Sequence, residues 1–427
     1  MTLRSDFEFR GLVQQSTDDS LLDRLSAGGV TVYAGFDPTA ASLHLGHLLQ
    51  ICTLRRLQLA NNRPIALAGG GTGLIGDPSF KASERPLLTL DELANNLSGI
   101  EEQLSRFLDF TSGAGSCQAL LLDNSAWLTT ISLTDFLRDI GKHFSVNQMI
   151  AKDSVKSRLE RADVGLSFTE FSYMLLQAYD FYRLHVDYGC TVQIGGSDQW
   201  GNIVVGVELI RKMAAHPSYG LTTPLLLRSD GQKFGKSEGG NDRVWLDARM
   251  TSPFQLFQFL LNSDDATMPA LLRFFTFLSH DEIVALDHAT IDKPHLRDAQ
   301  RSLANEVVSL VHGVESSRAA QRASEALFSE SISELDEATL LEVVGDAPST
   351  QVTREEVRGG LDAVDLLVRT QLASSKGEAR RFLDQRGVYV NNVRLEPSDA
   401  ITLEQALHSR YLVLRRGRHQ THLVVLS

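Results

Sequence analysis

The stretch TVYAGFDPTAASLHLGHLLQICTLRRLQLANNRPIALAGGG, residues 31–71, decides the fold. Strand-forming residues fill 31–36, and apolar residues recur at helical spacing over 45–60. A second apolar strand at 63–68 then ends in three glycines. Strands that are almost wholly apolar and are joined by a helix are typical of a parallel sheet with helices on both faces.

The following residues extend this pattern before it changes. Three more strands are predicted at 118–122, 191–194 and 224–228, and a helix is predicted over about 89–110. Beyond residue 247 the strand signals stop. The N-terminal part is therefore expected to be an α/β domain.

The C-terminal part is expected to contain helices and then a small mixed unit. Helical spacing fills 252–345, with a cap-like Ser279-His-Asp-Glu282 inside it. The last residues predict helices near 361–385 and two hairpins, one around Asn391-Asn392 and one over 411–418. The predicted division is 1–228 for the α/β catalytic domain, 229–345 for a loop and helical domain, 346–360 for a polar, Pro-containing linker and 361–427 for a small α+β domain.

Composition is that of an ordinary globular protein. Of the 427 residues, 43% are hydrophobic and 22% are charged, which is enough to bury a large core. Cys52, Cys117 and Cys190 are scattered, a pattern that favours reduced thiols over disulfides or a zinc site. The N-terminus lacks a targeting pattern, and no apolar run reaches the ~18 residues of a membrane span. We therefore expect a cytoplasmic protein without a membrane partner.

Charge is distributed unevenly along the chain. The net charge of −12 argues against nucleic-acid binding over the whole surface. Residues 361–427 nevertheless contain 10 Lys and Arg against 7 Asp and Glu, a balance of +3 that leaves −15 for the other 360 residues. An acidic body with a basic end domain localises contact with a polyanion.

Gly71-Thr-Gly-Leu-Ile-Gly76 matches the G-x-G-x-x-G pattern of dinucleotide-binding folds and follows a strand. Two features argue against a nicotinamide site. Asp77-Pro78 follows at once, and proline disfavours a helical conformation in the residue before it. The pattern also lies in the second strand–helix turn, whereas the fingerprint belongs in the first. The preferred interpretation is a turn that lets the backbone approach a ligand closely.

His44-Leu-Gly-His47 follows a loop at a strand end and opens the helix predicted after it. At i and i+3, both imidazoles can share one face of the helix start. A metal site would need a further carboxylate or histidine in register, and simple packing of the two rings is the other alternative. Beside free helix N-terminal amides, two imidazoles suit an anion such as phosphate. Gly46 would let a base or ribose lie close to the backbone.

Lys233-Phe-Gly-Lys-Ser237 lies on a turn-rich segment that contains glycine. A loop of this kind is most often simply solvated. Lysine is a compact charge on a flexible stem, and two lysines suit the task of following a phosphate through a reaction. Together with the two histidines, the loop predicts a grip on a nucleoside triphosphate that stabilises charge developing on pyrophosphate.

Tyr173, Gln177 and Asp180 recur at i, i+4 and i+7 of a predicted helix, next to its apolar stripe. They present a hydroxyl, an amide and a carboxylate in one row. The row is either a solvated face or the wall of a pocket for a small zwitterion with a polar tip.

Residues 193–200, Gln-Ile-Gly-Gly-Ser-Asp-Gln-Trp, are predicted to be a strand end that turns into a helix. Asp198 is well placed for a ribose diol, and the glycines allow an adenine to approach. A plain N-cap at Ser197 is compatible with this interpretation.

These motifs together resemble those of the bacterial tyrosyl-tRNA synthetases, which are class I aminoacyl-tRNA synthetases. HLGH at 44–47 is similar to the HIGH motif, and KFGKS at 233–237 is similar to the KMSKS loop. The resemblance covers nearly the whole chain, including a C-terminal stretch, 374–392, that is similar to a ribosomal-protein-type RNA-binding module. It implies a Rossmann-like catalytic domain, a helical domain on the anticodon side and a small α+β RNA-binding domain.

The resemblance implies a reaction in two steps. The carboxylate of tyrosine attacks the α-phosphorus of ATP, which is accompanied by Mg²⁺, and gives tyrosyl-adenylate and pyrophosphate. The 3′-end of tRNA(Tyr) then takes the tyrosyl group. The resemblance also implies that the protein itself holds no metal and that it is a homodimer.

The same resemblance assigns roles to three groups of residues. Residues expected to act in catalysis, mainly at the phosphates, are Thr39, His44, His47, Lys81, Arg85, Lys233, Lys236 and Ser237. Residues expected to bind tyrosine are Tyr33 and Asp180 at the phenol hydroxyl, Asp77 and Tyr173 at the ammonium, and Gln177 and Gln199. Residues expected to hold ATP are Gly35, Asp37, Gly46, Gly196, Asp198 and Lys236. The family varies at Gln50, so the ATP affinity cannot be predicted from it.

Two other functions remain open from the residues alone. Another nucleotidyl transferase of the HIGH superfamily, such as a tryptophan enzyme or a cytidylyltransferase, would use the phosphate motifs but not the hydroxyl-reading row. A non-catalytic RNA-binding protein would explain 361–427 and would leave the paired histidines and lysines idle.

Overall fold

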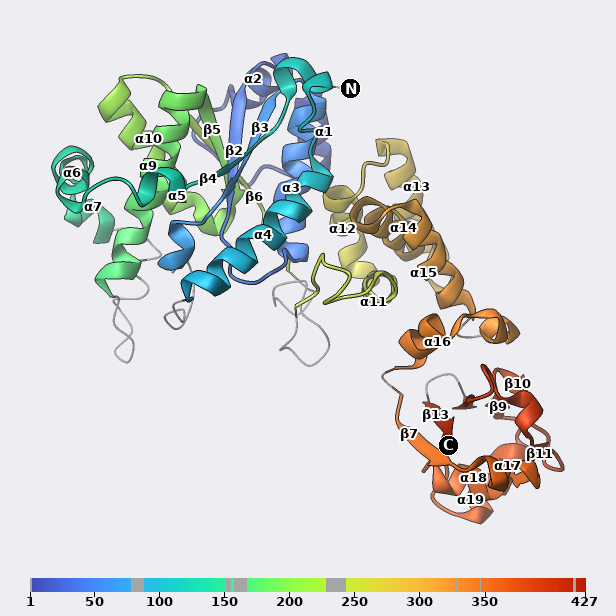
Figure 1. Cartoon of the computed structure of the whole chain (residues 1–427). Helices are drawn as coiled ribbons and strands as arrows, with labels where there is room; N and C mark the ends of the chain where they lie inside the picture. The colour runs from blue at the N-terminus through green and yellow to red at the C-terminus, as the bar shows by residue number, and fades with distance from the viewer. Residues whose placement is uncertain are drawn as a thin grey trace. The chain divides into compact units, whose positions relative to one another are not determined.

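A mostly parallel sheet organises the first of the two units into which contacts divide the chain (Figure 1). The computed structural model describes residues 2–77, 88–150, 155–156, 167–227, 243–326, 329–345, 347–417 and 420–427. The first unit comprises Met1–Ser252 and Phe259–Val311, and the second comprises Pro253–Gln258 and His312–Ser427.

The sheet has the strand order β1-β6-β5-β2-β3-β4. Its strands are β1 (Gln15–Ser16), β2 (Thr31–Phe36), β3 (Arg63–Ala68), β4 (Leu120–Asp123), β5 (Cys190–Gly196) and β6 (Tyr219–Thr223). The pairs from β6 to β4 are parallel, and the short edge strand β1 runs antiparallel to β6. The α/β fold with a parallel sheet is thus confirmed.

The chain reverses its direction across the sheet at β2. From β2 it proceeds outward through β3 to β4, and it then returns to place β5 on the other side of β2. Because strand–helix–strand connections are right-handed, helices of the two directions cover opposite faces. These are α3 (Leu45–Leu59) and α4 (Leu90–Phe107) on one face, and α9 (Phe168–Tyr188) and α10 (Trp200–Ala214) on the other (Figure 1). In such a sheet the ligand crevice lies at the carboxyl strand ends beside the reversal.

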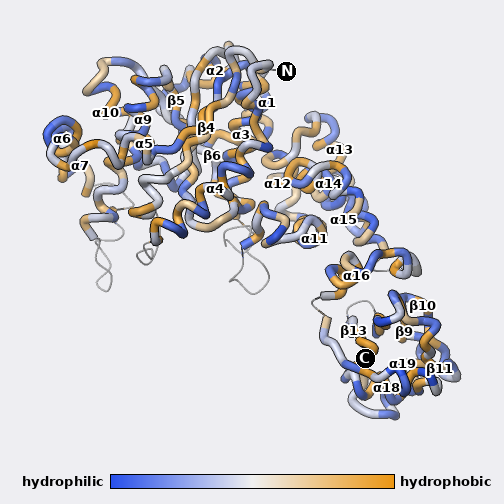
Figure 2. Tube along the Cα trace, viewed as in Figure 1, coloured by the Kyte–Doolittle hydropathy of each residue, from blue (hydrophilic) through white to orange (hydrophobic). Residues whose placement is uncertain are grey.

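The core under α9 and α10 joins these helices to the sheet. It packs Tyr33 and Ile65 of the strands against Phe181 and Leu209 of the helices, and hydrophobic residues concentrate along the central strands (Figure 2). α9 begins where the Ser167 hydroxyl accepts a hydrogen bond from a backbone amide of the first turn. These features fix the residue at which α9 begins and the face that it packs against the sheet. They therefore also fix the direction in which the polar residues of α9 point.

The remaining helices of the first unit surround this framework. They are α1 (Leu3–Arg10), α2 (Leu21–Ala27), α5 (Ser125–Leu128), α6 (Leu133–Asp135), α7 (Val146–Ile150), α12 (Met268–Phe275), α13 (His280–Asp292) and most of α14 (Asp298–His312). The predicted cap at Ser279 is confirmed, because its side chain and that of Glu282 form a reciprocal capping box. None of the described helices is long and apolar enough to cross a membrane.

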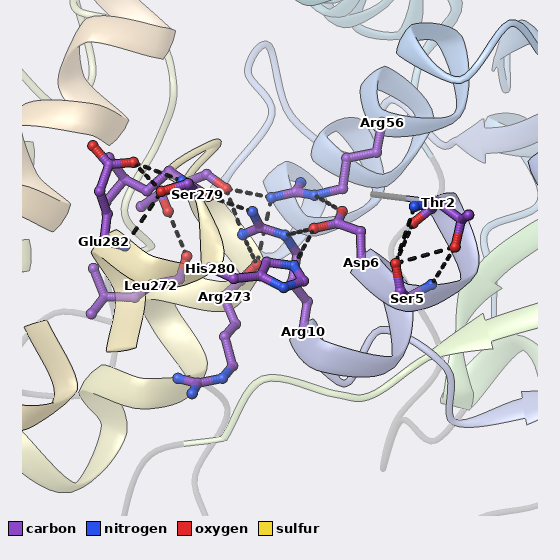
Figure 3. Close-up of polar contacts among 12 residues, drawn as sticks. Thr2, Ser5, Asp6, Arg10, Arg56, Leu272, Arg273, Ser279, His280 and Glu282 are labelled. Atoms are coloured by element: carbon purple, nitrogen blue, oxygen red, sulfur yellow. Dashed lines mark hydrogen bonds and ion pairs between the residues drawn. The ribbon is translucent and has the colours of Figure 1, made fainter. Parts of the chain in front are cut away.

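Two buried arginines tie α1 and α3 to the end of α12 (Figure 3). Arg10 donates to the carbonyls of Arg273, Thr276 and Leu278, and Arg56 donates to the carbonyl of Thr276 as well. Asp6 lies between them, 2.7 Å from Nε of Arg10 and 3.7 Å from Nε of Arg56. The two guanidinium groups thus satisfy the carbonyls of Arg273 and Thr276, at the end of α12, and Arg10 also satisfies that of Leu278 in the loop beyond it.

Two strand predictions need correction. The strand predicted at 224–228 is wrong over its described residues, 224–227, because the strand is Tyr219–Thr223, immediately before it. Pro224 has no amide to donate to a ladder, and Leu225 and Leu227 are 36% and 46% exposed. Thr222 and Thr223, although polar, are fully buried in the sheet. The strand predicted at 118–122 begins two residues later, at Leu120.

The second unit is built around a five-stranded sheet of order β10-β9-β12-β13-β7. Its strands are β7 (Ser349–Val352), β9 (Val388–Val390), β10 (Val393–Arg394), β12 (Tyr411–Arg416) and β13 (Gln420–Leu426); β8 (Leu361–Asp362) and β11 (Ala400–Ile401) pair separately. Its helices are α15 (Val314–Ala326), α16 (Glu337–Val344), α17 (Arg354–Arg358), α18 (Ala363–Arg369) and α19 (Lys376–Asp384), and α11 (Pro253–Leu261) contributes its first six residues. Both predicted hairpins form, as β9–β10 and β12–β13.

The predicted linker at 346–360 is instead part of this second sheet. β7 pairs in parallel with β13 along its whole length, and α17 follows directly. The polar, Pro-containing sequence at this place resembles a connection because β7 is an edge strand with exposed side chains. Only Val352 of this strand is fully buried, which leaves little hydrophobic pattern to detect.

Candidate active site

A cavity of about 510 Å³ opens at the carboxyl ends of β2 and β5, beside the reversal of the chain. Every described residue for which the sequence predicted a site role lines it: Tyr33, Gly35, Asp37, Thr39, His44, Gly46, His47, Asp77, Tyr173, Gln177, Asp180, Gly196, Asp198 and Gln199. Five others, Lys81, Arg85, Lys233, Lys236 and Ser237, lie outside the described residues. Motifs far apart in the sequence thus meet in one pocket.

The two histidines form a reciprocal cap at the start of α3. Nδ1 of His44 accepts a hydrogen bond from the Gly46 amide (3.0 Å), and Nδ1 of His47 accepts one from the His44 amide (3.2 Å). The rings stack with their centroids 3.8 Å apart. Because Nδ1 is the acceptor, each neutral ring carries its hydrogen on Nε2, which suits donation to a phosphate oxygen.

Gly46 makes room for this cap. A Cβ atom at this position would lie 2.9 Å from Cε1 of His44, so a larger residue would displace the capping ring. Within the described residues, the histidines belong to no group of three or more His, Cys, Asp or Glu that could hold a metal ion.

Asp37 links the loop after β2 to α9 and to the glycine-rich turn. Its Oδ2 accepts the hydroxyl hydrogen of Tyr173 (2.6 Å), and its Oδ1 accepts that of Thr72 (2.8 Å). Burial, together with the nearby Asp37 charge, raises the pKa of Tyr173 well above its usual value. Tyr173 therefore keeps its hydrogen and remains a donor to Asp37.

Asp180 is a buried carboxyl group at the wall of the cavity. Its Oδ1 accepts from Nε1 of Trp127 (2.7 Å), and its Oδ2 accepts from Nδ2 of Asn124 (2.9 Å). Burial raises the pKa of Asp180 to about 8, although both donors oppose the shift. A further donor directed at this group would favour its ionised form. The row that includes Asp180 is a buried pocket wall and not a solvated face.

A chain of amide side chains fixes Asp77 at the cavity. Asn202 donates to Gln177 (2.9 Å), Gln177 donates to Gln199 (3.2 Å), and Gln199 donates to Asp77 (2.6 Å). Since an ionised carboxylate only accepts, Asp77 directs the nitrogen of Gln199 toward itself, and this orientation propagates along the chain.

Three buried polar atoms in the described wall of the cavity have no hydrogen-bond partner. They are the Tyr33 hydroxyl, Oε1 of Gln193 and Oε1 of Gln50. Tyr33 and Gln193 are register partners in β2 and β5, so their side chains leave the same face of the sheet. Burial, and then the charge of Asp180, raises the pKa of the Tyr33 phenol well above its usual value. Unpaired buried groups of this kind cost about 1–3 kcal/mol each, which favours a ligand that pairs with them.

The glycine-rich turn at 69–76 is shaped by side chains that press against it. A Cβ atom on Gly69 would lie 2.2 Å from Oδ1 of Asp37, and one on Gly70 would lie 2.3 Å from Oδ1 of Asp123. Within the described residues, the turn leads only into the short 3₁₀ turn Thr72–Leu74. Up to Asp77, where the described segment ends, the turn presents no α-helix N-terminus to a pyrophosphate.

The sequence interpretation missed several residues of this wall. Asn124 and Trp127 follow the carboxyl end of β4, and Thr72 follows that of β3. Their position just after parallel strands is a usable signal, because the carboxyl ends meet at one edge of the sheet. Gln193 sits inside a strand, where only its polarity in an apolar run marks it.

Comparison with known proteins identifies the relatives of this chain. Residues 26–329 match the family model for class I tRNA synthetases (W and Y), and residues 340–424 match that for the tyrosine–tRNA ligase SYY-like C-terminal domain. The chain is 49% identical over 427 residues to the tyrosine–tRNA ligase of Roseiflexus castenholzii, covering 100% of this chain and 99% of that one. It is 48% identical to that of Geobacillus stearothermophilus, with 99% of each covered.

A solved structure agrees with these matches. The C-terminally truncated mitochondrial tyrosyl-tRNA synthetase of Aspergillus nidulans superimposes with a TM-score of 0.69 at 32% identity. The alignment covers 77% of this chain and 94% of the fungal one.

Proposed function

Because the chain belongs to the tyrosine–tRNA ligase family of class I aminoacyl-tRNA synthetases, we propose that the cavity holds tyrosine and ATP during formation of tyrosyl-adenylate. The family model for the catalytic part is shared with tryptophan enzymes. The C-terminal domain and the full-length relatives belong to tyrosine–tRNA ligases. The protein is an aminoacyl-tRNA ligase, and its substrates are tyrosine, ATP and tRNA.

The buried end of the cavity is where the phenol of tyrosine would bind. The observation that carries this assignment is the unpaired hydroxyl of Tyr33 in the same buried wall as the Asp180 carboxyl. A phenol placed there accepts from Tyr33 and donates to Asp180, whose other donors come from Trp127 and Asn124. Phenylalanine would leave these groups unpaired, at a cost of about 1–3 kcal/mol per group.

The ammonium group of tyrosine would bind beside Asp77 and Tyr173. The carboxylate of Asp77 is held in place by Gln199. The oxygen of Tyr173 can accept a hydrogen bond while its own hydrogen goes to Asp37. Gln177, which lies between Asn202 and Gln199 in the amide chain, completes a polar cradle for the charged end of the amino acid.

ATP would occupy the side of the cavity where α3 begins. His44 and His47 supply Nε2 donors for its phosphates, and Thr39 adds a hydroxyl from the loop after β2. Asp198, in the short 3₁₀ turn just after β5, suits the ribose, and Gly35, Gly46 and Gly196 leave room for the base. Lys81, Arg85, Lys233, Lys236 and Ser237 are proposed to complete the phosphate contacts. Mg²⁺ would arrive with the phosphates of ATP as part of the substrate.

The first step needs no general base. The tyrosine carboxylate is already ionised, attacks the α-phosphorus and forms the P–O bond of the adenylate, while the bond to pyrophosphate breaks. In the second step a ribose hydroxyl at the 3′-end of tRNA attacks the adenylate carbonyl, loses its proton, and AMP leaves. Catalysis of the first step consists of positioning and stabilisation of charge on the leaving pyrophosphate.

The C-terminal domain is proposed to bind tRNA(Tyr) through its basic face. Exposed cations on it are Lys376, Arg380, Arg381, Arg386, Arg394 and Arg410. Half-buried Phe382 and Tyr389 lie under arginine guanidinium groups, at 4.4 Å for Arg416 over Phe382 and 4.5 Å for Arg415 over Tyr389. Phosphate contacts of such cations release counterions, so binding should weaken steeply with salt.

We further propose a homodimer that acts in the cytoplasm. Large apolar side chains from α6 to α7 stand exposed at Leu133 (73%), Leu137 (52%), Val146 (57%) and Ile150 (42%). Several exposed large apolar side chains within one segment favour coverage by another protein chain. Sedimentation velocity at several concentrations tests the dimer, and a Leu133→Glu/Val146→Glu variant should be monomeric.

ATP–pyrophosphate exchange with a panel of amino acids tests the whole assignment. Exchange should depend on tyrosine and be far slower with phenylalanine or tryptophan at equal concentration. Exchange driven equally by tryptophan would contradict the phenol site, and exchange without any amino acid would contradict the ligase chemistry.

A further inference from the structure

The C-terminal sheet is fastened to helix α15 by the side chain of Asn392. Its Nδ2 donates to the carbonyl of Ala326 (3.2 Å), the last residue of α15, and to the carbonyl of Ser329 (2.8 Å). The carbonyl of Ala326 is one that the end of a helix leaves without an intrahelical partner. One amide group at the tip of a hairpin thus satisfies the end of a helix more than 60 residues earlier in the chain.

The orientation of the Asn392 amide is fixed from both sides. Its Oδ1 accepts from Nε of Arg415 (3.0 Å), and Arg415 also donates to the carbonyl of Gly417 and lies over Tyr389. Arginine can only donate, and the two carbonyls can only accept, so the amide fits in one orientation. Asn392 is 8% exposed.

The backbone of Asn392 also restricts what can replace it. Asn391 and Asn392 have φ of 49° and 63°, in the left-handed region that only Gly, Asn and Asp adopt readily. Asn391 uses its side chain within the domain, donating to Gln405 and accepting from Val413. Asn392 is the member of the pair that reaches out to α15.

Two further contacts surround this joint. Ile332, Leu340 and Val344 from the segment after α15 pack against Tyr411, Val413 and Leu423 on the outer face of the sheet. The hydroxyl of Tyr411 donates to Glu337 (2.9 Å) at the start of α16. The sheet is therefore covered on both faces, because α18 and α19 pack on its inner face.

We propose that Asn392 is a positioning residue for the charging of tRNA: it locks the basic face of the C-terminal domain to α15, so that one rigid surface meets the tRNA. This inference rests on the proposed binding of tRNA by that domain. α15 itself carries two exposed cations, Arg318 and Arg322, one turn apart. A surface that is ordered before binding avoids the loss of entropy that ordering would cost on binding.

The substitution Asn392→Gly isolates the side chain, since glycine tolerates the positive φ. In the full-length enzyme, ATP–pyrophosphate exchange should stay at the wild-type rate, because Asn392 does not line the cavity. The KM for tRNA in aminoacylation should rise about tenfold, with kcat at saturating tRNA nearly unchanged, since two linked contacts gain affinity from a fixed geometry. Val393→Thr, at the exposed neighbour, is the matched control and should behave as wild type.

Hydrogen exchange distinguishes the loss of the contact between Asn392 and α15 from unfolding of the C-terminal domain. In Asn392→Gly, the amides of α16 should lose protection while those of β12 and β13 keep it. If this variant does not fold, Tyr411→Phe weakens the same joint at Glu337 and should raise the KM for tRNA by a smaller factor. An unchanged KM in a folded variant would overturn the proposal, as would an equal loss of exchange and charging. Failure of the wild-type enzyme to bind tRNA through its C-terminal domain would instead refute the proposed function of that domain.

Discussion

Tyr173 donates its hydroxyl hydrogen to Asp37 over 2.6 Å, and this bond connects a residue expected to bind tyrosine with one expected to bind ATP. Asp37 also accepts a hydrogen bond from Thr72, on the turn after β3. The two halves of the cavity therefore share one carboxylate. A substitution on one side should be measurable on the other.

Replacing Tyr173 by phenylalanine tests this connection. The variant removes the hydrogen bond from Tyr173 to Asp37, and a hydrogen bond to a charged group contributes about 1.5–3 kcal/mol. We expect the KM for tyrosine to rise at least tenfold and the KM for ATP to rise as well, measured by pyrophosphate exchange. Tyr182→Phe, on the same helix but away from the cavity, is the control. If only the KM for tyrosine rose, Asp37 would keep its position without the hydrogen bond from Tyr173.

Tyr33→Phe should separate stability from specificity. The buried hydroxyl of Tyr33 has no partner in the unliganded protein, so its removal should leave the melting temperature unchanged or higher. The same change removes a donor to the phenol of tyrosine, and the preference for tyrosine over phenylalanine should fall about tenfold. Thermal unfolding and exchange with both amino acids measure the two effects. A large drop in melting temperature would show that the hydroxyl has a structural partner.

The raised pKa of Asp180 predicts a pH-dependent stability. The pKa is about 8 in the folded protein and about 3.9 in an unfolded chain. The folded state thus holds a proton that the unfolded state has lost, and this stabilisation is full below about pH 4 and disappears as the pH rises through 8. The melting temperature of the unliganded wild type should therefore be lower at pH 8 than at pH 6. The same difference in melting temperature should be smaller in Asp180→Asn.

Tyrosine binding should show the opposite dependence on pH. The phenol donates to the ionised form of Asp180, so binding releases a proton below pH 8, and the affinity for tyrosine should rise between pH 6 and pH 8. Equilibrium binding at three pH values measures it. The same slope in Asp180→Asn would assign the effect to another group.

The cap at the start of α3 allows the catalytic and structural roles of His44 to be separated. Asparagine is a good N-cap residue, so His44→Asn should keep the melting temperature, whereas His44→Ala should lose about 0.5–2 kcal/mol of stability. Both variants lack Nε2 and should slow adenylate formation about a hundredfold in pre-steady-state measurements. If His44→Asn formed the adenylate at the wild-type rate, the role of His44 would be limited to capping the helix.

Sequence reasoning succeeded where a pattern is local. The strand at 63–68 and the cap of α13 follow from apolar runs and capping residues, and both are confirmed. It failed where burial depends on distant partners. Buried Thr222 and Thr223 gave no hydrophobic signal, and the exposed edge strand β7 looked like a linker because its strand character comes from pairing with β13.

The candidate site divides in the same way. His44 and Asp180 stand in motifs with recognisable spacing, whereas Asn124 and Trp127 matter only because β4 ends beside α9 and brings them to Asp180. A polar residue that is not part of a periodic pattern can be recognised as a site residue only once the fold shows which residues lie next to it.

The buried arginines at the end of α12 bear on how the first unit folds. Arg10 and Arg56 share a single carboxylate, Asp6, and burial lowers the pKa of Arg56 to about 10. Their remaining charge is stabilised by carbonyls that are in place only once α12 has formed and docked. The first ten residues and the residues near 276 should therefore become ordered in one cooperative step, although they are far apart in the sequence. Docking of the N-terminal helix α1 then completes the folding of the catalytic unit.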